Sequence, residues 1–387
     1  MKAPGAADVA LMSAAPPRPS HVGLDGLLAY AVRRGASDVH LKAGARPIVR
    51  ANGALELVAG AAALQPDDTE RFADELLNGH EHKRAELVAD GEADLSHELA
   101  GAGRFRVSIF RQRGTVSIVL RVVPSRVMTL EELGLPPAVG RLAGEERGII
   151  LVTGTTGSGK STTMAAMIDQ INRTSHKHVV TIEDPIEMLH TDRGSLINQR
   201  EVGLDTPSFA AALRRVLRQD PDVIMIGEIR DLVTMETALS AAETGHLVLS
   251  TMHTLDATET VNRAIGLFPL HQQGPVRAML AGTLKGIVSQ RLVRTADGEG
   301  RVPACEVMVT TGRARDMILN PEDTGRLHEV IREGEYYGMQ TFDQSLFDHV
   351  TAGRVTLEAA IAAATSPHDF KLMLDAGAAR RDAAQAA

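Results

Sequence analysis

Short groups of apolar residues follow one another regularly along the first part of the chain. From Leu24 to Val32 they recur at helical spacing, which predicts a helix that Gly35 ends in the left-handed conformation. A polar helical segment follows at 67–78, and strands at 104–110 and 115–123 pair across Gly114. We expect a small α+β domain over residues 21–123, after a disordered leader at 1–20 that is rich in alanine and proline.

The pattern changes further along the chain. Continuous apolar segments appear at 148–153, 178–182, 222–226 and 246–250, and helical stretches separate them. Buried strands that alternate with helices predict a parallel sheet covered on both faces, and therefore an α/β fold. In such sheets the functional residues gather at the carboxyl ends of the strands.

Prolines and composition mark the borders of this second domain. Pro124 and the pair Pro136-Pro137 bracket one short helical stretch, so we expect a linker over residues 124–137. The α/β domain then covers residues 138–375 and becomes mainly helical after about residue 300. The Ala- and Arg-rich end, residues 376–387, is expected to be disordered.

Composition narrows the classes of function. The chain has 387 residues, one cysteine, no tryptophan and a formal charge of −8. A single cysteine excludes an internal disulfide, a four-cysteine zinc site and an iron–sulfur cluster, and favours a reducing cytoplasm. The acidic balance and the low content of aromatic residues, 3%, disfavour nucleic acid as a partner. No apolar segment approaches the roughly 20 residues that span a bilayer.

Residues 154–161 read GTTGSGKS and fit the phosphate-loop pattern between an apolar strand and a helix. The glycines let backbone N–H groups turn towards a polyphosphate, the lysine reaches its oxygens, and the serine can hold Mg2+. The strand-to-helix setting disfavours the alternative, an ordinary glycine-rich turn. The predicted nucleotide-binding residues are Gly154, Thr155, Thr156, Gly157, Ser158, Gly159, Lys160, Ser161 and Thr162.

Acidic residues follow the next two strands of the predicted sheet. Glu183, Asp184 and Glu187 come at the end of the second strand, at the edge where the phosphates must lie. Any one of them could cap a helix, but three acids beside a phosphate loop favour the handling of metal and water. The third strand leads to Gly227 and then Glu228, which is the first acid at that strand end and is expected to act through the Mg2+ shell.

Two histidines and a group of arginines are further candidates. His246 and His253 lie at the fourth strand, and we expect both beside the carboxylates, although a lone histidine is usually a satisfied polar residue. Arginines are concentrated on one hairpin of the first domain. They either face solvent or complete the phosphate site across a subunit boundary, because Lys160 alone supplies little positive charge. The arginines are Arg104, Arg106, Arg111, Arg113 and Arg121.

Together these strings resemble the secretion and type IV pilus ATPase superfamily, and above all its pilus retraction motors. They are the phosphate loop, TIEDPIE at 181–187, GEIRD at 227–231, and AAETGH at 241–246 followed by His253-Thr254. ASDVHL at 36–41, GRFRV at 103–107 and GMQTFD at 338–343 extend the resemblance over about residues 24–375. It implies a PAS-like N-terminal α+β domain, a RecA-like P-loop ATPase domain with a helical C-terminal region, and a hexameric ring that binds ATP and Mg2+ between subunits.

The resemblance also implies a role for each matching residue. Lys160 and Ser161 correspond to the phosphate and Mg2+ ligands, and Glu187 to the general base. Glu228 corresponds to the acid that binds Mg2+, either directly or through a water molecule. The other catalytic residues that the resemblance implies are His246, His253, Arg106, Arg113 and Arg121.

One departure from the resemblance bears on function. Retraction motors usually carry an AIRNLIRE helix, whereas residues 313–320 read RARDMILN and keep Arg315 and Ile318 but little else. The resemblance therefore implies either a hexameric ATPase that powers type IV pilus retraction and twitching motility, or an accessory retraction ATPase.

Two other functions are alternatives. A pilus assembly or type II secretion ATPase is disfavoured, because those relatives typically add an N-terminal domain and a four-cysteine zinc module. A non-hydrolysing, nucleotide-gated interaction protein is also disfavoured, because such a protein needs no water-activating acid, whereas this chain has Lys160, Glu187 and Glu228.

For the leading hypothesis, the expected partners are further copies of the chain, an inner-membrane pilus platform protein and a paralogous pilus ATPase. The expected location is cytoplasmic, peripheral to the inner membrane at the pilus base.

Overall fold

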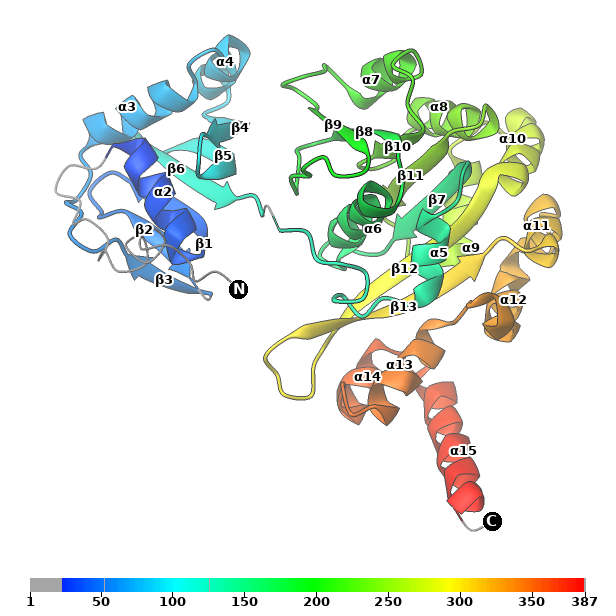
Figure 1. Ribbon diagram of the computed structural model, residues 1–387. Coiled ribbons are helices and arrows are strands. Elements are labelled where there is room, and N and C mark those ends of the chain that lie inside the picture. Colours follow the sequence, from blue (N-terminus) through cyan, green and yellow to red (C-terminus); the bar gives the residue numbers. More distant parts are fainter. Residues whose placement is uncertain (1–22, 52, 125, 386–387) are drawn as a thin grey trace, which may run out of the picture. The chain divides into compact units, whose positions relative to one another are not determined.

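The chain divides into two compact units, residues 1–125 and 126–387 (Figure 1). The structure, a computed structural model, describes residues 23–51, 53–124 and 126–385. The predicted leader at 1–20 lies outside these described residues. The junction falls inside the segment 124–137 that the prolines mark as a linker.

The first unit is a six-stranded antiparallel sheet in the order β3-β2-β1-β6-β5-β4. Val107 and Ile109 of β5 pack in one core with Leu27 and Phe72 from two helices. The first helix ends at Gly35, whose φ of 68° is the predicted left-handed cap. The elements are α2 (Leu24–Arg34), β1 (Ala36–Lys42), β2 (Ile48–Ala51), β3 (Ala54–Leu57), α3 (Pro66–Leu76), α4 (Glu81–Ala89), β4 (Glu92–Leu99), β5 (Gly103–Gln112) and β6 (Thr115–Val122).

The second unit is built on a seven-stranded sheet in the order β13-β12-β7-β11-β10-β8-β9. The four predicted strands are present as β7 (Gly148–Thr153), β8 (His178–Glu183), β10 (Val223–Ile226) and β11 (Leu247–Met252), and they are parallel to their neighbours. The helices between them are α6 (Lys160–Thr174), α7 (Phe209–Val216) and α8 (Leu232–Glu243). Helix α5 (Pro137–Ala143) precedes β7, and helices α9 (Ala257–Gly266) and α10 (Leu270–Thr283) follow β11.

Helices cover both faces of this sheet, as the apolar strands predict (Figure 1). Successive residues of a strand point to opposite faces, so Ile149 and Leu151 of β7 pack in one core and Ile150 and Val152 in the other. Helices α5 and α6 contribute to the second core, and α7 to α10 contribute to the first. Apolar packing on both sides leaves the strand ends as the place for polar groups.

Three strands of the second sheet were not predicted, namely β9 (Leu196–Glu201), β12 (Leu284–Arg294) and β13 (Arg301–Val309). The expectation of a mainly helical region after about residue 300 is wrong for β13, which pairs antiparallel with β12. These strands contain buried polar residues, and hydrogen bonds to other side chains make their burial possible. Ser289, for example, accepts a hydrogen bond from Thr153 at 2.9 Å.

Two other segments differ from the predictions. The short helix expected between Pro124 and Pro136 is a turn, and its Leu130 and the adjacent Leu135 are buried in the core of the second unit. The predicted disordered tail, 376–387, is helical up to Gln385.

The elements after β13 are α11 (Gly312–Leu319), α12 (Leu327–Glu333), α13 (Phe342–Thr351), α14 (Leu357–Ala363) and α15 (Pro367–Gln385). Along the described part of the chain, no helix has the length and apolar character needed to cross a membrane.

A buried carboxyl group lies where β13 meets helix α9. Glu306 is 7% exposed, and its Oε1 accepts a hydrogen bond from the backbone N–H of Ala257, the first residue of that helix, at 2.8 Å. Burial raises the pKa of Glu306 to about 7, and the nearby charges of Asp256 and Asp343 act in the same direction. The hydrogen bond from Ala257 and the charge of Arg291 oppose this shift in the pKa. The ionised form is therefore disfavoured in the folded state.

We expect this raised pKa to make the protein less stable as pH rises. Between the ordinary pKa of 4.5 and about 7, the folded state binds more protons than the unfolded state, so the free energy of unfolding falls with pH across that window. For a shift of this size the loss is about 3 kcal/mol above pH 7. Glu306→Gln should be nearly neutral at pH 5 and stabilising at pH 8, as measured by urea unfolding.

The matched control for this prediction is Glu243→Gln, since Glu243 is exposed at the end of α8. Its effect on the urea midpoint should be small at both pH values. A Glu306→Gln variant whose stability difference from wild type is equal at pH 5 and pH 8 would contradict the expectation.

Candidate functional site

The predicted phosphate loop joins the end of β7 to the start of α6. Gly154, Gly157 and Gly159 all have positive φ, at 141°, 79° and 93°. A Cβ atom on Gly154 would lie 2.5 Å from the backbone oxygen of Gln290 in β12 and 2.5 Å from the Oγ of Ser158. The neighbouring strand therefore requires glycine at the first position of the loop.

Lys160, the first residue of α6, folds over this loop. Its Nζ donates hydrogen bonds to the backbone oxygens of Gly154 at 2.8 Å and Thr155 at 2.9 Å. Burial lowers the pKa of Lys160, and the negative charges of Glu228 and Glu187 act against that change. The structure thus brings both predicted carboxylates within electrostatic reach of the lysine.

The three acids after β8 have different environments. Glu183 is 7% exposed, and its carboxylate accepts hydrogen bonds from the Thr181 hydroxyl at 2.7 Å and from the Gln199 amide at 3.1 Å. Burial raises the pKa of Glu183. Asp184 and Glu187 are exposed. Glu183 is therefore part of the scaffold, whereas the two exposed acids can meet solvent and a ligand.

Glu228 links the ends of β10 and β11. Its Oε1 lies 2.6 Å from Nη2 of Arg230, and its Oε2 lies 3.3 Å from Nε2 of His253. The preceding residue, Gly227, accepts a hydrogen bond from the hydroxyl of Thr251 at 2.7 Å, which fixes the end of β10 against β11. The predicted pair of Glu228 and His253 is therefore together in the structure.

The expectation that His246 lies beside the carboxylates is wrong. His246 precedes β11, and its Nδ1 lies 3.0 Å from the backbone oxygen of Ala241. Its own carbonyl accepts a hydrogen bond from Gly148, the first residue of β7, whereas the phosphate loop follows the last residue of that strand. The whole length of β11 separates His246 from His253. The two histidines are close in sequence, which led to the expectation, but they lie at opposite ends of the extended strand β11.

The predicted arginines belong to the first unit. Arg106 of β5 lies opposite Arg121 of β6, and Nε of Arg121 pairs with the buried carboxylate of Asp38 at 2.9 Å. Arg113 lies in the turn between these strands, where its φ is 51°. That these arginines donate to a phosphate site stays a prediction.

Sequence reasoning missed the polar residues that support the site from unpredicted strands. Gln290 of β12 donates to the hydroxyl of Thr163 in α6 at 2.9 Å, next to the phosphate loop. Gln199 and Glu201 of β9 bond to the segment that carries Glu187. Residues 196–201 read LINQRE, two apolar residues followed by four polar ones, so neither strand alternation nor a continuous apolar segment marks β9 in the sequence.

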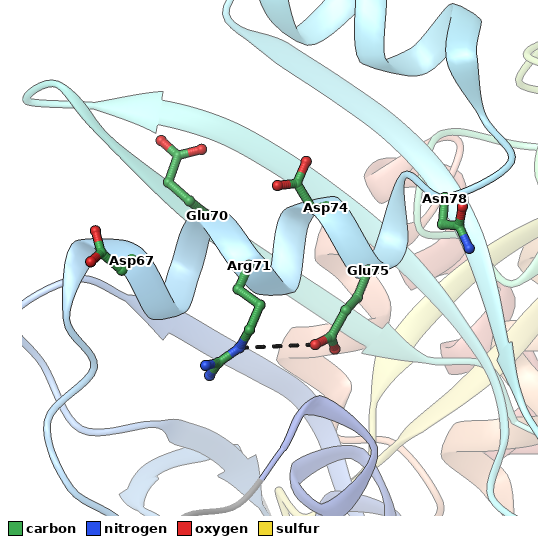
Figure 2. A pocket seen from close by; sticks show the side chains of 6 residues that line it. All are labelled: Asp67, Glu70, Arg71, Asp74, Glu75 and Asn78. Atoms are coloured by element: carbon green, nitrogen blue, oxygen red, sulfur yellow. Dashed lines mark ion pairs between the residues drawn. The ribbon is translucent and has the colours of Figure 1, made fainter.

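Two hollows lie away from these residues. One, of about 490 Å³, lies in the second unit beside α5, α13 and α15 and is lined in part by Arg141, Phe347 and Met373. The other, of about 580 Å³, runs along α3 of the first unit (Figure 2). Figure 2 shows its acidic side chains projecting from one helix, with Arg71 paired to Glu75 at 3.9 Å. Neither hollow includes a residue of the phosphate loop.

Replacement of Gly154 by alanine should disrupt the loop. Its Cβ would collide with Gln290 of β12, so the loop must move, and we expect affinity for a fluorescent ATP analogue to fall at least about tenfold. Gly157→Ala is the control, because a Cβ there meets no atom within 4 Å and adds only the strain of a positive φ. That strain is roughly 1–2 kcal/mol. Equal affinities in the two variants would contradict the steric argument.

Comparisons with known proteins show the family of the chain. The family model described as "Type II/IV secretion system protein" matches residues 19–337. The chain is 42% identical over 344 residues to the type IV pilus retraction ATPase PilT of Pseudomonas aeruginosa, covering 89% of this chain and 98% of that protein. It is 43% identical over 354 residues to the type IV pilus ATPase PilU of the same organism, covering 91% of each.

A solved structure is similar over nearly its whole length. The crystal structure of the pilus retraction motor PilT with bound ADP matches with a TM-score of 0.82 and 44% identity, over 90% of this chain and 99% of that chain. Sequence identity alone does not separate likeness to PilT from likeness to PilU. The phosphate loop, the acids behind it and these matches lead to one assignment: the chain belongs to the type II/IV secretion system protein family and is a homologue of the pilus retraction ATPase PilT.

Proposed function

We propose that this protein is a motor ATPase that hydrolyses Mg-ATP to power the retraction of type IV pili. The observation that carries the proposal is that Lys160, which folds over the phosphate loop, lies within electrostatic reach of Glu187 and Glu228, whose charges oppose the fall in its pKa that burial causes. Phosphoryl transfer depends on positioning and charge neutralisation more than on covalent chemistry by the protein, and this arrangement offers both.

The loop fits the phosphates of a nucleotide. Two of the three N–H donors of Lys160 bond to loop carbonyls, so a phosphate oxygen can take the third. The Oγ of Ser158 is buried and has no hydrogen-bond partner in the part of the chain that the structure describes. The start of α6 adds further N–H groups and the positive end of a helix dipole. We assign phosphate binding to Gly154, Thr155, Thr156, Gly157, Ser158, Gly159, Lys160, Ser161 and Thr162.

Two residues are suited to hold Mg2+. The hydroxyl of Ser161 lies one residue into α6, and the carboxylate of Glu228 lies at the end of β10. Hydroxyl and carboxylate oxygens are the ligands that Mg2+ prefers, often with water between. A bound Mg2+ would neutralise charge on the phosphoryl oxygens.

Glu187 has the environment of a general base. It is exposed, so water can reach it, and it lies within electrostatic reach of Lys160 at the phosphate loop. Its carboxylate accepts a proton from a water molecule that attacks the terminal phosphorus, while the bond from that phosphorus to the bridging oxygen breaks and ADP leaves. Glu183 is unsuited to that role, since its carboxylate is buried and already accepts hydrogen bonds from Thr181 and Gln199.

The types of the two domains and the ring assembly are assigned from the family to which the chain belongs. We assign residues 21–123 as a PAS-like domain and residues 138–375 as a RecA-like ATPase domain, in a homohexameric ring. The two compact units and the phosphate loop after a central parallel strand support this assignment. Arg106, Arg113 and Arg121 of one subunit are the proposed donors to a neighbour's nucleotide. Arg113 lies in the turn of the hairpin and Arg121 is exposed, so a second chain can reach both.

The proposed partners are an inner-membrane pilus platform protein and a paralogous pilus ATPase. The proposed location is the cytoplasmic face of the inner membrane, at the base of the pilus. Both proposals rest on the similarity of the chain to PilT and PilU over most of its length.

An accessory role like that of PilU is the second candidate, and helix α11 is the observation that favours it. The helix covers the segment that departs from the motif of the retraction motors. Its buried residues, Ala314, Met317 and Ile318, are all apolar and pack in the core, although only Ile318 matches the motif. The exposed positions keep Arg315 but differ from the motif at Arg313, Asp316, Leu319 and Asn320. These exposed differences would alter contacts with a partner more than the stability of the fold.

Glu187→Gln tests the chemistry. Loss of a general base should lower ATP turnover about 100-fold or more, while binding of a fluorescent ATP analogue stays within about twofold of wild type. Steady-state phosphate release and analogue titration measure the two effects. Asp184→Asn is the control, since Asp184 is the other exposed acid of the cluster. Equal and negligible rates in wild type and Glu187→Gln would defeat the motor proposal.

Complementation tests the biological role. In a bacterium that lacks its own retraction ATPases, we expect this chain alone to restore twitching motility and the Glu187→Gln variant to fail. Wild-type protein that turns over ATP but restores motility only with a paralogous ATPase present would select the accessory role instead.

A further inference from the structure

The segment that carries Glu187 has no regular secondary structure. Residues 184–195 form neither helix nor strand between β8 and β9, so side-chain hydrogen bonds must determine their shape. Helix α6 holds the later half through Asn172, whose Nδ2 donates to Thr191 O at 2.8 Å and whose Oδ1 accepts from Arg193 N at 3.0 Å. The earlier half, with Glu187, must be held by something else.

The amide of Gln199, on the edge strand β9, holds that earlier half. Its Nε2 donates to the backbone oxygen of Met188 at 2.8 Å and to Oε1 of Glu183 at 3.1 Å. Its Oε1 accepts from the backbone N–H of His190 at 2.8 Å. One side chain therefore bonds to both sides of the segment that Glu187 occupies, at the end of β8 and just beyond Glu187.

An amide suits this position. Two of the three partners, Met188 O and the Glu183 carboxylate, accept hydrogen bonds, and the third, His190 N–H, donates one. An amide matches this set, because it has two N–H donors and a separate acceptor oxygen. Two residues further along β9, the buried Glu201 adds a second fixed point, since its Oε2 accepts from Ile186 N at 2.9 Å.

We propose that Gln199 is a positioning residue for ATP turnover, which holds Glu187 in the place where it acts on water. The inference rests on the proposed function of Glu187. Gln199 bonds to Glu183 and to the segment 184–195, and it lies on β9, whereas the phosphate loop follows β7. It therefore affects the chemical step and leaves nucleotide affinity unchanged. A displacement of about 1 Å at a catalytic group can cost roughly 100-fold in rate.

Gln199→Met removes all three hydrogen bonds at nearly constant side-chain length. We expect kcat for ATP to fall about tenfold or more, with KM and the affinity for a fluorescent ATP analogue within about twofold of wild type. Asn198→Leu is the matched control. Asn198 is the neighbour on the opposite face of β9, and its side chain bonds to Nε2 of His178, the first residue of β8, at 2.8 Å, so its loss should leave kcat within about twofold.

A double-mutant cycle separates positioning from a general structural effect. If Gln199 acts through Glu187, then Gln199→Met lowers single-turnover rates in the wild-type background but changes them less than about twofold in the Glu187→Gln background. An equal fall of about tenfold in both backgrounds would overturn the inference. So would an unchanged kcat in Gln199→Met while Glu187→Gln is inactive.

Failure of the proposed function has a different signature, because Glu187→Gln would then turn over ATP like wild type. Should Gln199→Met unfold, Gln199→Glu serves in its place. It keeps the acceptor for His190 but loses both donated bonds, so the same fall in kcat is expected.

Discussion

The second unit depends on one physical constraint, the burial of its parallel sheet on both faces. Ile149 to Val152 of β7 alternate between two apolar cores, so no polar side chain can be placed along the middle of that strand without a partner. Polar chemistry is therefore confined to the strand ends. Because β7, β11, β10 and β8 pair in order, the groups that follow their carboxyl ends meet at one edge, among them Lys160, Glu187 and Glu228.

Burial also separates the acidic residues that stabilise the structure from those that can take part in the reaction. Glu183, Glu201 and Glu306 are buried, and each accepts hydrogen bonds that fix a loop or a helix end. These bonds hold the three groups in place, and for Glu183 and Glu306 burial also raises the pKa. Asp184 and Glu187 are exposed. The same residue type therefore supports the site in one environment and can react with water in the other.

The chain is about equally similar to PilT and PilU, at 42% and 43% identity. Helix α11 has a buried face and an exposed face, because Met317 and Ile318 pack in the core and Arg315 and Leu319 face outward. Substitutions on the exposed face leave packing intact but change what a partner meets. Retraction and accessory roles would then differ through contacts between proteins rather than through the chemistry of hydrolysis.

The sequence by itself determined the phosphate loop, the four central strands and the acids Glu187 and Glu228, because each is a local pattern of glycine, apolar and charged residues. It misplaced His246, whose position depends on the direction of β11. Only the tertiary structure revealed that residues 196–201, 284–294 and 301–309 form the strands β9, β12 and β13, and that Gln199 supports the segment with Glu187. Their polar residues are buried through partners remote in sequence, such as Ser289 with Thr153, which is 136 residues away. Local hydrophobicity carries no information about such pairs, because the folded chain supplies the partner.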